Sequence, residues 1–109
     1  MIKTLNALAE PNRLKIVDLL QSGPRSVGEI AEELGIRQPQ VSKHLKVLVE
    51  AGLLEIERDA QRHIFHIRPQ PFRELDNWLE SFRRTWDERY DQLDELLRQW
   101  QANDHDQPE

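Results

Sequence analysis

The chain has 109 residues, a formal net charge of −5, 38% hydrophobic residues and no cysteine. This length fits one small domain. The absence of cysteine excludes disulfide scaffolds, thiolate zinc sites and thiol nucleophiles. The sequence has neither an apolar run of transmembrane length nor a signal-peptide pattern at its start, so we expect a soluble cytoplasmic protein with no membrane partner.

The charge is unevenly distributed along the chain. Residues 1–68 carry ten Lys and Arg against nine Asp and Glu, a balance of +1, whereas residues 69–109 carry five against eleven, a balance of −6. The window 34–49 has cations and no carboxylate; its basic residues are Arg37, Lys43, His44 and Lys46. A basic window inside a mixed surface is typical of a site for an anionic partner.

Apolar residues at helical spacing predict three helices before residue 35. Pro11 opens the second helix and Gly23-Pro24 ends it. Ser26 and Glu29 have the capping-box pattern that opens the third helix, and Gly35 closes it because a left-handed turn suits a residue without Cβ. The side chains expected to face inward are Leu14, Val17 and Leu20, with Ile16 and Leu19 beside them, and then Val27, Ile30, Ala31 and Leu34.

A fourth helix follows after only two residues. It starts at Gln38-Pro39, stops at Gly52 and repeats Val41, Leu45 and Leu48 along one stripe. Two short helices across a tight, glycine-containing turn have the spacing of a helix-turn-helix. Strand-forming residues in 53–58 and 62–68, joined by the turn 59–61, predict a β-hairpin. The order of elements predicts a mainly α protein with a small β-hairpin, the winged helix-turn-helix.

The sequence after the hairpin predicts one long helix over about 71–101, roughly 45 Å at 1.5 Å per residue. Apolar residues occupy alternating heptad positions along it, except at Arg89. The polar tail 103–109 cannot build a core and is expected to be flexible. We therefore expect one DNA-binding and dimerisation domain over 1–102, with its wing at about 53–68.

The long helix has two overlapping interpretations. It is either an intramolecular core helix or a dimerisation helix that pairs with its copy and with the apolar stripe of the first helix. The preceding 68 residues are too few to cover an apolar seam of this length, and monomers rarely expose so large a patch. We therefore favour a homodimer, with an interface of Leu5, Leu8, Leu79, Phe82, Trp86 and Leu93.

The outer face of the fourth helix is polar and cationic. If Val41 points inward, Lys43 and Lys46 point away, and Gln40 and Ser42 flank the outer face. Amide, ammonium and hydroxyl groups of this kind suit base edges in a major groove. The plainer interpretation is a solvated helix face. We favour the DNA interpretation because the face coincides with a helix-turn-helix and lacks carboxylates.

Arg58 and Arg62 flank the turn of the predicted wing. Both are candidates for contact with DNA phosphates or a minor groove. They could equally be charges that protect a sheet edge from pairing, and Asp59 between them would repel a phosphate.

The sequence gives little support to metal binding or catalysis. His63 and His66 are three residues apart in a predicted strand, so period-two alternation sends them to opposite faces and they cannot share an ion. There is no glycine-rich phosphate loop and no arrangement of nucleophile and base. We expect no metal site, no cofactor and no enzymatic activity.

Four segments together resemble the ArsR/SmtB family of bacterial winged-helix repressors, over about residues 3–68. They are 7–14 (ALAEPNRL), 26–31 (SVGEIA), 38–45 (QPQVSKHL) and 49–53 (VEAGL). The resemblance implies a homodimer that binds operator DNA and usually represses its own operon. It places Gln38, Gln40, Ser42 and Lys43 at the base edges and His44 near the DNA backbone.

The sequence departs from the family pattern in three places. The third helix lacks the Cys-x-Cys motif of the metal sensors, and the last helix, 71–101, lacks histidine. The wing turn lacks the glycine that many relatives have. The chain therefore looks like a metal-free branch of the family.

We expect a homodimeric, sequence-specific repressor that reads an imperfect palindrome in double-stranded operator DNA. Gln38, Gln40, Ser42 and Lys43 are the predicted base contacts, and the predicted backbone contacts are His44, Lys46, Arg58 and Arg62. The alternative is a winged-helix adaptor that binds proteins rather than DNA; an acidic outer face on the fourth helix would distinguish it, and this sequence has none.

Overall fold

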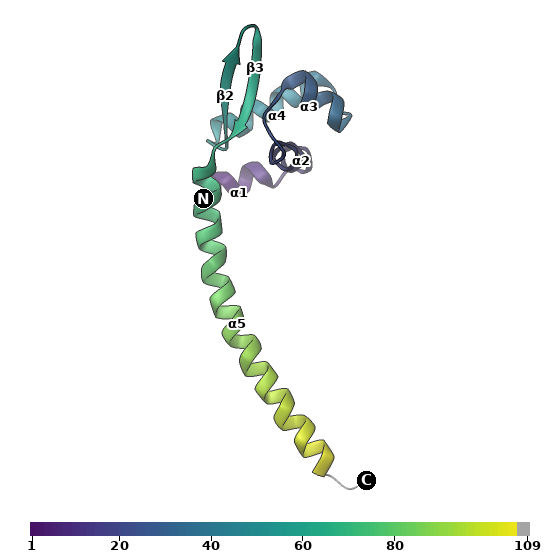
Figure 1. The fold of residues 1–109 in the computed structure, drawn as a ribbon, viewed down its shortest axis with the longest axis vertical. Helices are drawn as coiled ribbons and strands as arrows, with labels where there is room; N and C mark the ends of the chain where they lie inside the picture. The colour runs from purple at the N-terminus through teal and green to yellow at the C-terminus, as the bar shows by residue number, and fades with distance from the viewer. Residues whose placement is uncertain (107–109) are drawn as a thin grey trace. The chain divides into compact units, whose positions relative to one another are not determined.

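The computed structural model describes residues 1–106, with side chains up to residue 102, so 107–109 of the predicted tail 103–109 lie outside the described residues. The described residues form five helices and three strands. Figure 1 labels the helices and the two strands of the hairpin. In chain order they are α1 (Ile2–Leu8), α2 (Pro11–Leu20), β1 (Arg25–Ser26), α3 (Val27–Leu34), α4 (Gln38–Glu50), β2 (Leu54–Asp59), β3 (Arg62–Ile67) and α5 (Pro69–Asp106). The fold is a winged helix-turn-helix with a long last helix, as predicted.

Glu10 and Pro11 together start α2. The Glu10 carboxylate accepts a hydrogen bond from the backbone N–H of Arg13 at 2.9 Å, and Pro11 occupies the first turn, where a missing N–H costs nothing. The prediction for the inward face of this helix is partly wrong. Leu14 is 54% exposed, while Ile16 takes the fully buried position with Val17 and Leu20.

The capping box predicted at the start of α3 is confirmed. The Ser26 hydroxyl accepts from the Glu29 N–H at 3.3 Å, and the Glu29 carboxylate accepts from the Ser26 N–H at 3.1 Å. Gly35 ends the helix in the left-handed conformation, with φ of 66°, as a C-terminal glycine should. Only two residues separate Gly35 from the start of α4 at Gln38, so the helix-turn-helix geometry follows from local signals.

The core lies between α2, α3, α4 and the sheet. The predicted stripe of α4, Val41, Leu45 and Leu48, is buried, and Leu53 and Leu54 after it are buried as well. Full burial of an aliphatic side chain of this size contributes about 1.5–3 kcal/mol to stability. The stripe therefore anchors α4 firmly and leaves its opposite face to solvent.

The wing is part of a three-stranded antiparallel sheet in the order β1-β3-β2, not a free hairpin. The short β1 pairs with β3, placing Arg25 opposite Phe65 and Ser26 opposite Ile64. A two-residue strand is too short to show an alternating pattern, so the sequence did not indicate it. The turn between β2 and β3 holds Ala60 at φ of 55°, a conformation that normally favours glycine.

The last helix begins two residues earlier than predicted. Pro69 and Pro71 both lie in its first turn, where backbone N–H groups have no partner within a helix, so both prolines are tolerated. The helix continues to Asp106, five residues beyond the predicted end.

The chain divides into two compact units, Met1–Leu75 and the segment from Asp76 onward. Within the residues that the structure describes, no helix is both long enough and apolar enough to cross a membrane.

Candidate nucleic-acid interface

The outer face of α4 presents the side chains that the sequence singled out. Gln38, Gln40, Ser42 and Lys43 are all exposed, and Lys46 lies exposed one turn further along the same helix. We call the set Gln40, Ser42, Lys43 and Lys46 the cationic face. Because burial of Val41, Leu45 and Leu48 fixes the rotation of the helix, these side chains are held out toward solvent.

Among the described residues, neither lysine of the cationic face is paired with a carboxylate. In the described part of the chain, no carboxylate oxygen lies within 4.0 Å of the ammonium nitrogen of Lys43 or Lys46. An unpaired, hydrated ammonium group can exchange its counterion for a phosphate or a guanine edge. The cationic face therefore has the charge and the hydrogen-bond donors that binding to DNA requires.

His44, predicted near the DNA backbone, faces another part of the protein. Its ring is half-buried, and its Nδ1 lies 3.6 Å from the Oε2 of Glu10, the residue that caps α2. The contact joins α4 to the start of α2. His44 is therefore placed to hold α4 against its neighbour, and its contact with DNA stays a prediction.

The two wing arginines differ in their surroundings. Arg58 is exposed and lies opposite His63 in the strand register. Arg62 donates from Nη2 to the Oε1 of Glu29 at 2.6 Å, although the two residues are 33 positions apart in sequence. The ion pair ties the start of β3 to the capping box of α3, so a phosphate would have to compete with Glu29 for Arg62.

The carboxylate that holds Arg62 is itself well satisfied. Glu29 accepts from the backbone N–H and the hydroxyl of Ser26, at 3.1 and 2.9 Å. The Ser26 backbone hydrogen bond, followed by the Ser26 hydroxyl and then Arg62, lowers the pKa of the Glu29 carboxyl below its usual value. Sequence reasoning found the capping box but missed this tie, because no local pattern reports a contact over 33 residues.

The described residues offer no cluster suited to a metal ion. No group of three His, Cys, Asp or Glu side chains converges anywhere among them. His63 and His66 lie on opposite faces of β3, and the Nε2 of His66 is 2.5 Å from the Oε2 of Glu57.

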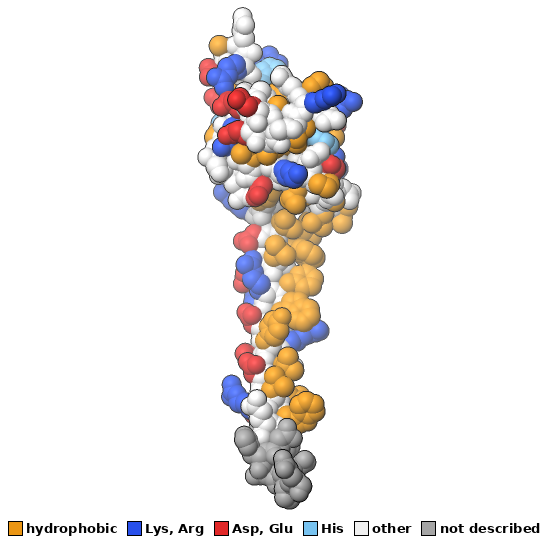
Figure 2. Space-filling view, turned by 90° about the vertical axis from the view of Figure 1, so that its right-hand side faces the viewer, with side chains coloured by type: hydrophobic (Ala, Val, Ile, Leu, Met, Phe, Trp, Pro, Cys, Tyr) orange, Lys and Arg blue, Asp and Glu red, His pale blue; other side chains and the backbone are white. Residues whose placement is uncertain are grey.

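The second unit carries an apolar surface along one side of α5, which we call the apolar seam. Figure 2 shows hydrophobic side chains along one side of this helix and mostly charged side chains along the other. The large exposed members are Trp78, Leu79, Phe82, Trp86, Tyr90, Leu93, Leu96, Leu97 and Trp100. The seam includes four of the six predicted interface residues: Leu79, Phe82, Trp86 and Leu93.

The other two predicted interface residues are on α1. Leu5 is exposed, whereas Leu8 is half-buried and packs against the core of its own unit. Leu5 is therefore the better placed of the two for contact with a second copy.

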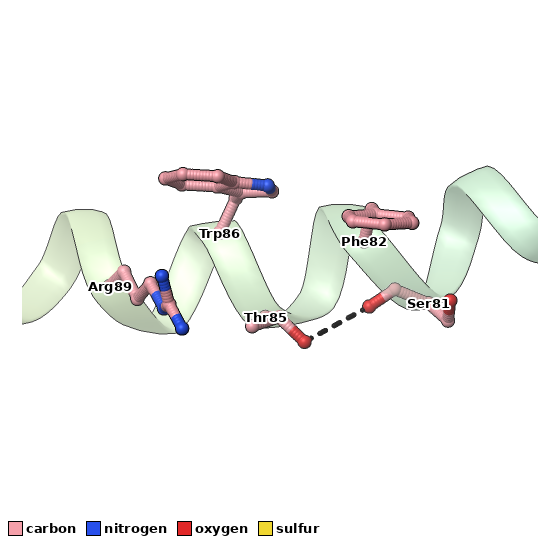
Figure 3. Close-up of a pocket in the computed structure, with 5 residues that line it drawn as sticks. All are labelled: Ser81, Phe82, Thr85, Trp86 and Arg89. Carbon is pink, nitrogen blue, oxygen red and sulfur yellow. Dashed lines mark hydrogen bonds between the residues drawn. The ribbon is translucent and has the colours of Figure 1, made fainter.

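The aromatic residues of the seam contact one another within the helix. Trp78 and Phe82 pack edge to face at a centroid distance of 4.8 Å. Figure 3 shows Phe82 and Trp86 projecting from the same side of the helix, while Ser81, Thr85 and Arg89 lie along its lower edge in this view. Arg89, which interrupts the heptad pattern, places its guanidinium 5.3 Å from the ring centroid of Trp86.

Comparison with known proteins also identifies a helix-turn-helix in the first part of the chain. A family model described as a helix-turn-helix domain matches residues 8–57. The transcriptional repressor SdpR of Bacillus subtilis is 32% identical over 82 residues, which are 75% of this chain and 91% of that protein. The HTH-type transcriptional regulator Rv2034 of Mycobacterium tuberculosis is 38% identical over 76 residues, 70% of this chain and 71% of that protein.

Solved structures agree with the sequence comparisons. The transcriptional repressor BigR from Xylella fastidiosa superposes with a TM-score of 0.62 at 33% identity, covering 74% of this chain and 83% of that chain. A homodimeric winged helix-turn-helix DNA-binding domain from Mycobacterium bovis superposes with a TM-score of 0.63 at 31% identity, covering 74% and 75%. The chain belongs to the ArsR family of winged helix-turn-helix transcriptional repressors.

Proposed function

We propose that the protein is a homodimeric, sequence-specific DNA-binding repressor that acts on an imperfect palindrome in the operator of its own operon. The observation that carries this proposal is the cationic face of α4, which is exposed, free of carboxylates and held in place by a buried stripe. Relatives that are transcriptional repressors support it.

The side chains of the cationic face divide by chemistry into base readers and phosphate binders. The amide of Gln40 can donate to and accept from an adenine edge, and Lys43 can donate to the acceptors of guanine. Ser42 hydrogen-bonds with either kind of base, and Gln38 reaches the groove from the first turn of the helix. These four residues are proposed to contact bases.

Phosphate contacts supply most of the affinity in this scheme. Lys46 lies one turn beyond Ser42 on α4, and Arg58 is exposed on the wing. Arg62 is the weaker candidate because Glu29 already holds it. Contacts of this kind position a protein on the duplex and make its affinity depend strongly on salt.

Dimerisation through α5 completes the proposed arrangement. An apolar seam that carries three tryptophans needs a partner surface of the same kind, and a second copy of the chain provides one. The homodimeric state of the Mycobacterium bovis domain supports this. Two α4 helices related by a two-fold axis would read successive major grooves of a palindrome, about 34 Å apart.

The experiment that tests the proposal is selection of bound fragments from random and genomic DNA at two salt concentrations. We expect a palindromic consensus, enrichment of the DNA upstream of the protein's own gene, and affinity that falls steeply as salt rises. Binding that selects no sequence would contradict the assignment of the four base contacts. Failure to bind any DNA would contradict the proposed function itself.

A further inference from the structure

A groove lies beside the cationic face, between α4 and the hairpin of β2 and β3. We call it the wing groove. Its volume is about 370 Å³, which lies within the range of pockets that hold small ligands. Its apolar floor consists of Leu45 and Val49 from α4, of Ile56 and Phe65 from the hairpin, and of Val27 from α3.

The exposure of Ile56 shows that apolar surface on the floor of the groove is accessible to solvent. Leu54 and Ile56 lie on the same face of β2, because side chains alternate along a strand. Leu54 is 1% exposed, whereas Ile56 is 45% exposed, although its cross-strand neighbour Phe65 is buried. A flat apolar group placed on Ile56 and Val49 would remove this surface from water, which contributes about 25 cal/mol per Å².

Polar groups line the rim of the groove asymmetrically. Ser42 and Lys46 stand on the α4 side, and His63 stands on the β3 side. Within residues 1–102 no carboxylate oxygen lies within 4.0 Å of the Lys46 ammonium or the His63 ring. Glu50, one turn further along α4, also lines the groove and would repel an anionic group placed beside it. Lys46 is therefore the position on the rim that suits a single negatively charged group.

We propose that the wing groove binds a small organic acid, with its apolar body on Ile56 and Val49 and its carboxylate at Lys46 and Ser42. The proposal rests on the proposed function in one respect, namely that ligand and DNA exclude each other. Both need the Lys46 ammonium, and the ligand would occupy the space beside α4 through which a DNA strand passes to the wing. The acid would thus release the protein from its operator.

The first test measures ligand binding without DNA. The probe is phenylacetate, titrated into the full-length protein while the methyl signals of Ile56 and Val49 are followed by NMR. We expect saturable shifts of these signals. The neutral analogue phenylacetamide, which has nearly the same shape, should bind about tenfold more weakly, because its carboxamide lacks the negative charge that pairs with the Lys46 ammonium.

Two lysine variants distinguish phenylacetate binding in the wing groove from general attraction of an anion to the cationic face. Lys46→Met should weaken phenylacetate binding about tenfold, whereas Lys43→Met, which removes a neighbouring cation outside the groove, should leave it unchanged. Equal effects of the two substitutions would overturn the carboxylate position. Absence of any shift at Ile56 and Val49 up to about 10 mM phenylacetate would overturn the site, since binding weaker than this is below about 3 kcal/mol.

The second test measures competition with the selected operator fragment by fluorescence anisotropy. Phenylacetate should raise the apparent Kd of the wild-type protein for DNA in proportion to groove occupancy. Ile56→Thr keeps a β-branched residue in the strand, so it should keep DNA binding and lose most of this response. Phenylacetate binding that leaves DNA affinity unchanged would overturn the competition. Failure of the wild type to bind DNA would refute the proposed function, while the NMR titration would still decide the groove.

Discussion

Replacing Trp86 by alanine should convert the dimer into monomers at concentrations where the wild type is paired. Trp86 leaves 47% of its surface exposed in one chain. For a tryptophan this is about 110 Å², and at 25 cal/mol per Å² its burial contributes about 3 kcal/mol per protomer. Two copies of the substitution would therefore weaken dimerisation by up to about 6 kcal/mol, or about 10⁴-fold in Kd. This is an upper value, because buried area converts incompletely into affinity.

Sedimentation equilibrium over a concentration series measures the effect directly. The matched control is Arg84→Ala, a substitution on the charged side of α5, which should leave the dimer unchanged. Circular dichroism of both variants shows whether the helix is retained. A Trp86→Ala protein that keeps its helical signal and dimerises within about twofold of the wild type would refute the assignment of the apolar seam as the interface.

Three further predictions concern the winged-helix unit. Lys43→Glu should lower operator affinity by about 1–3 kcal/mol per half-site in an anisotropy titration, while Lys15→Glu on α2 should not; equal losses would indicate a general charge effect. The pKa of Glu29 is lowered in the folded protein, so its stabilising effect is present above the pKa of the unfolded chain and is lost as pH falls through the lower folded value. The stability difference between wild type and Glu29→Gln in urea denaturation should therefore shrink on acidification below about pH 4.5, and a difference constant with pH would contradict the contacts assigned to Glu29. Ala60→Gly should raise the free energy of unfolding by about 0.5–1 kcal/mol, because glycine adopts the positive φ of the wing turn without strain; a decrease would contradict that conformation.

The sequence by itself determined the elements whose signals are local. The capping box of Ser26 and Glu29, the left-handed stop at Gly35 and the apolar stripe of α4 each depend on residues within a few positions of one another. Hydrogen bonds and side-chain periodicity at that range are set by backbone geometry alone. The rotation of α4, and with it the outward position of the cationic face, was therefore predictable.

Only the tertiary structure decided which faces of the helices are buried and which residues distant in sequence come into contact. On α2, Leu14 and Ile16 are similarly apolar, and only the packing of the other elements around α2 decides that Ile16 is buried while Leu14 is exposed. The pairing of β1 with β3, the ion pair of Arg62 with Glu29 and the wing groove all join segments far apart in sequence. Such contacts depend on how packed elements fill space, which periodicity within one segment does not encode.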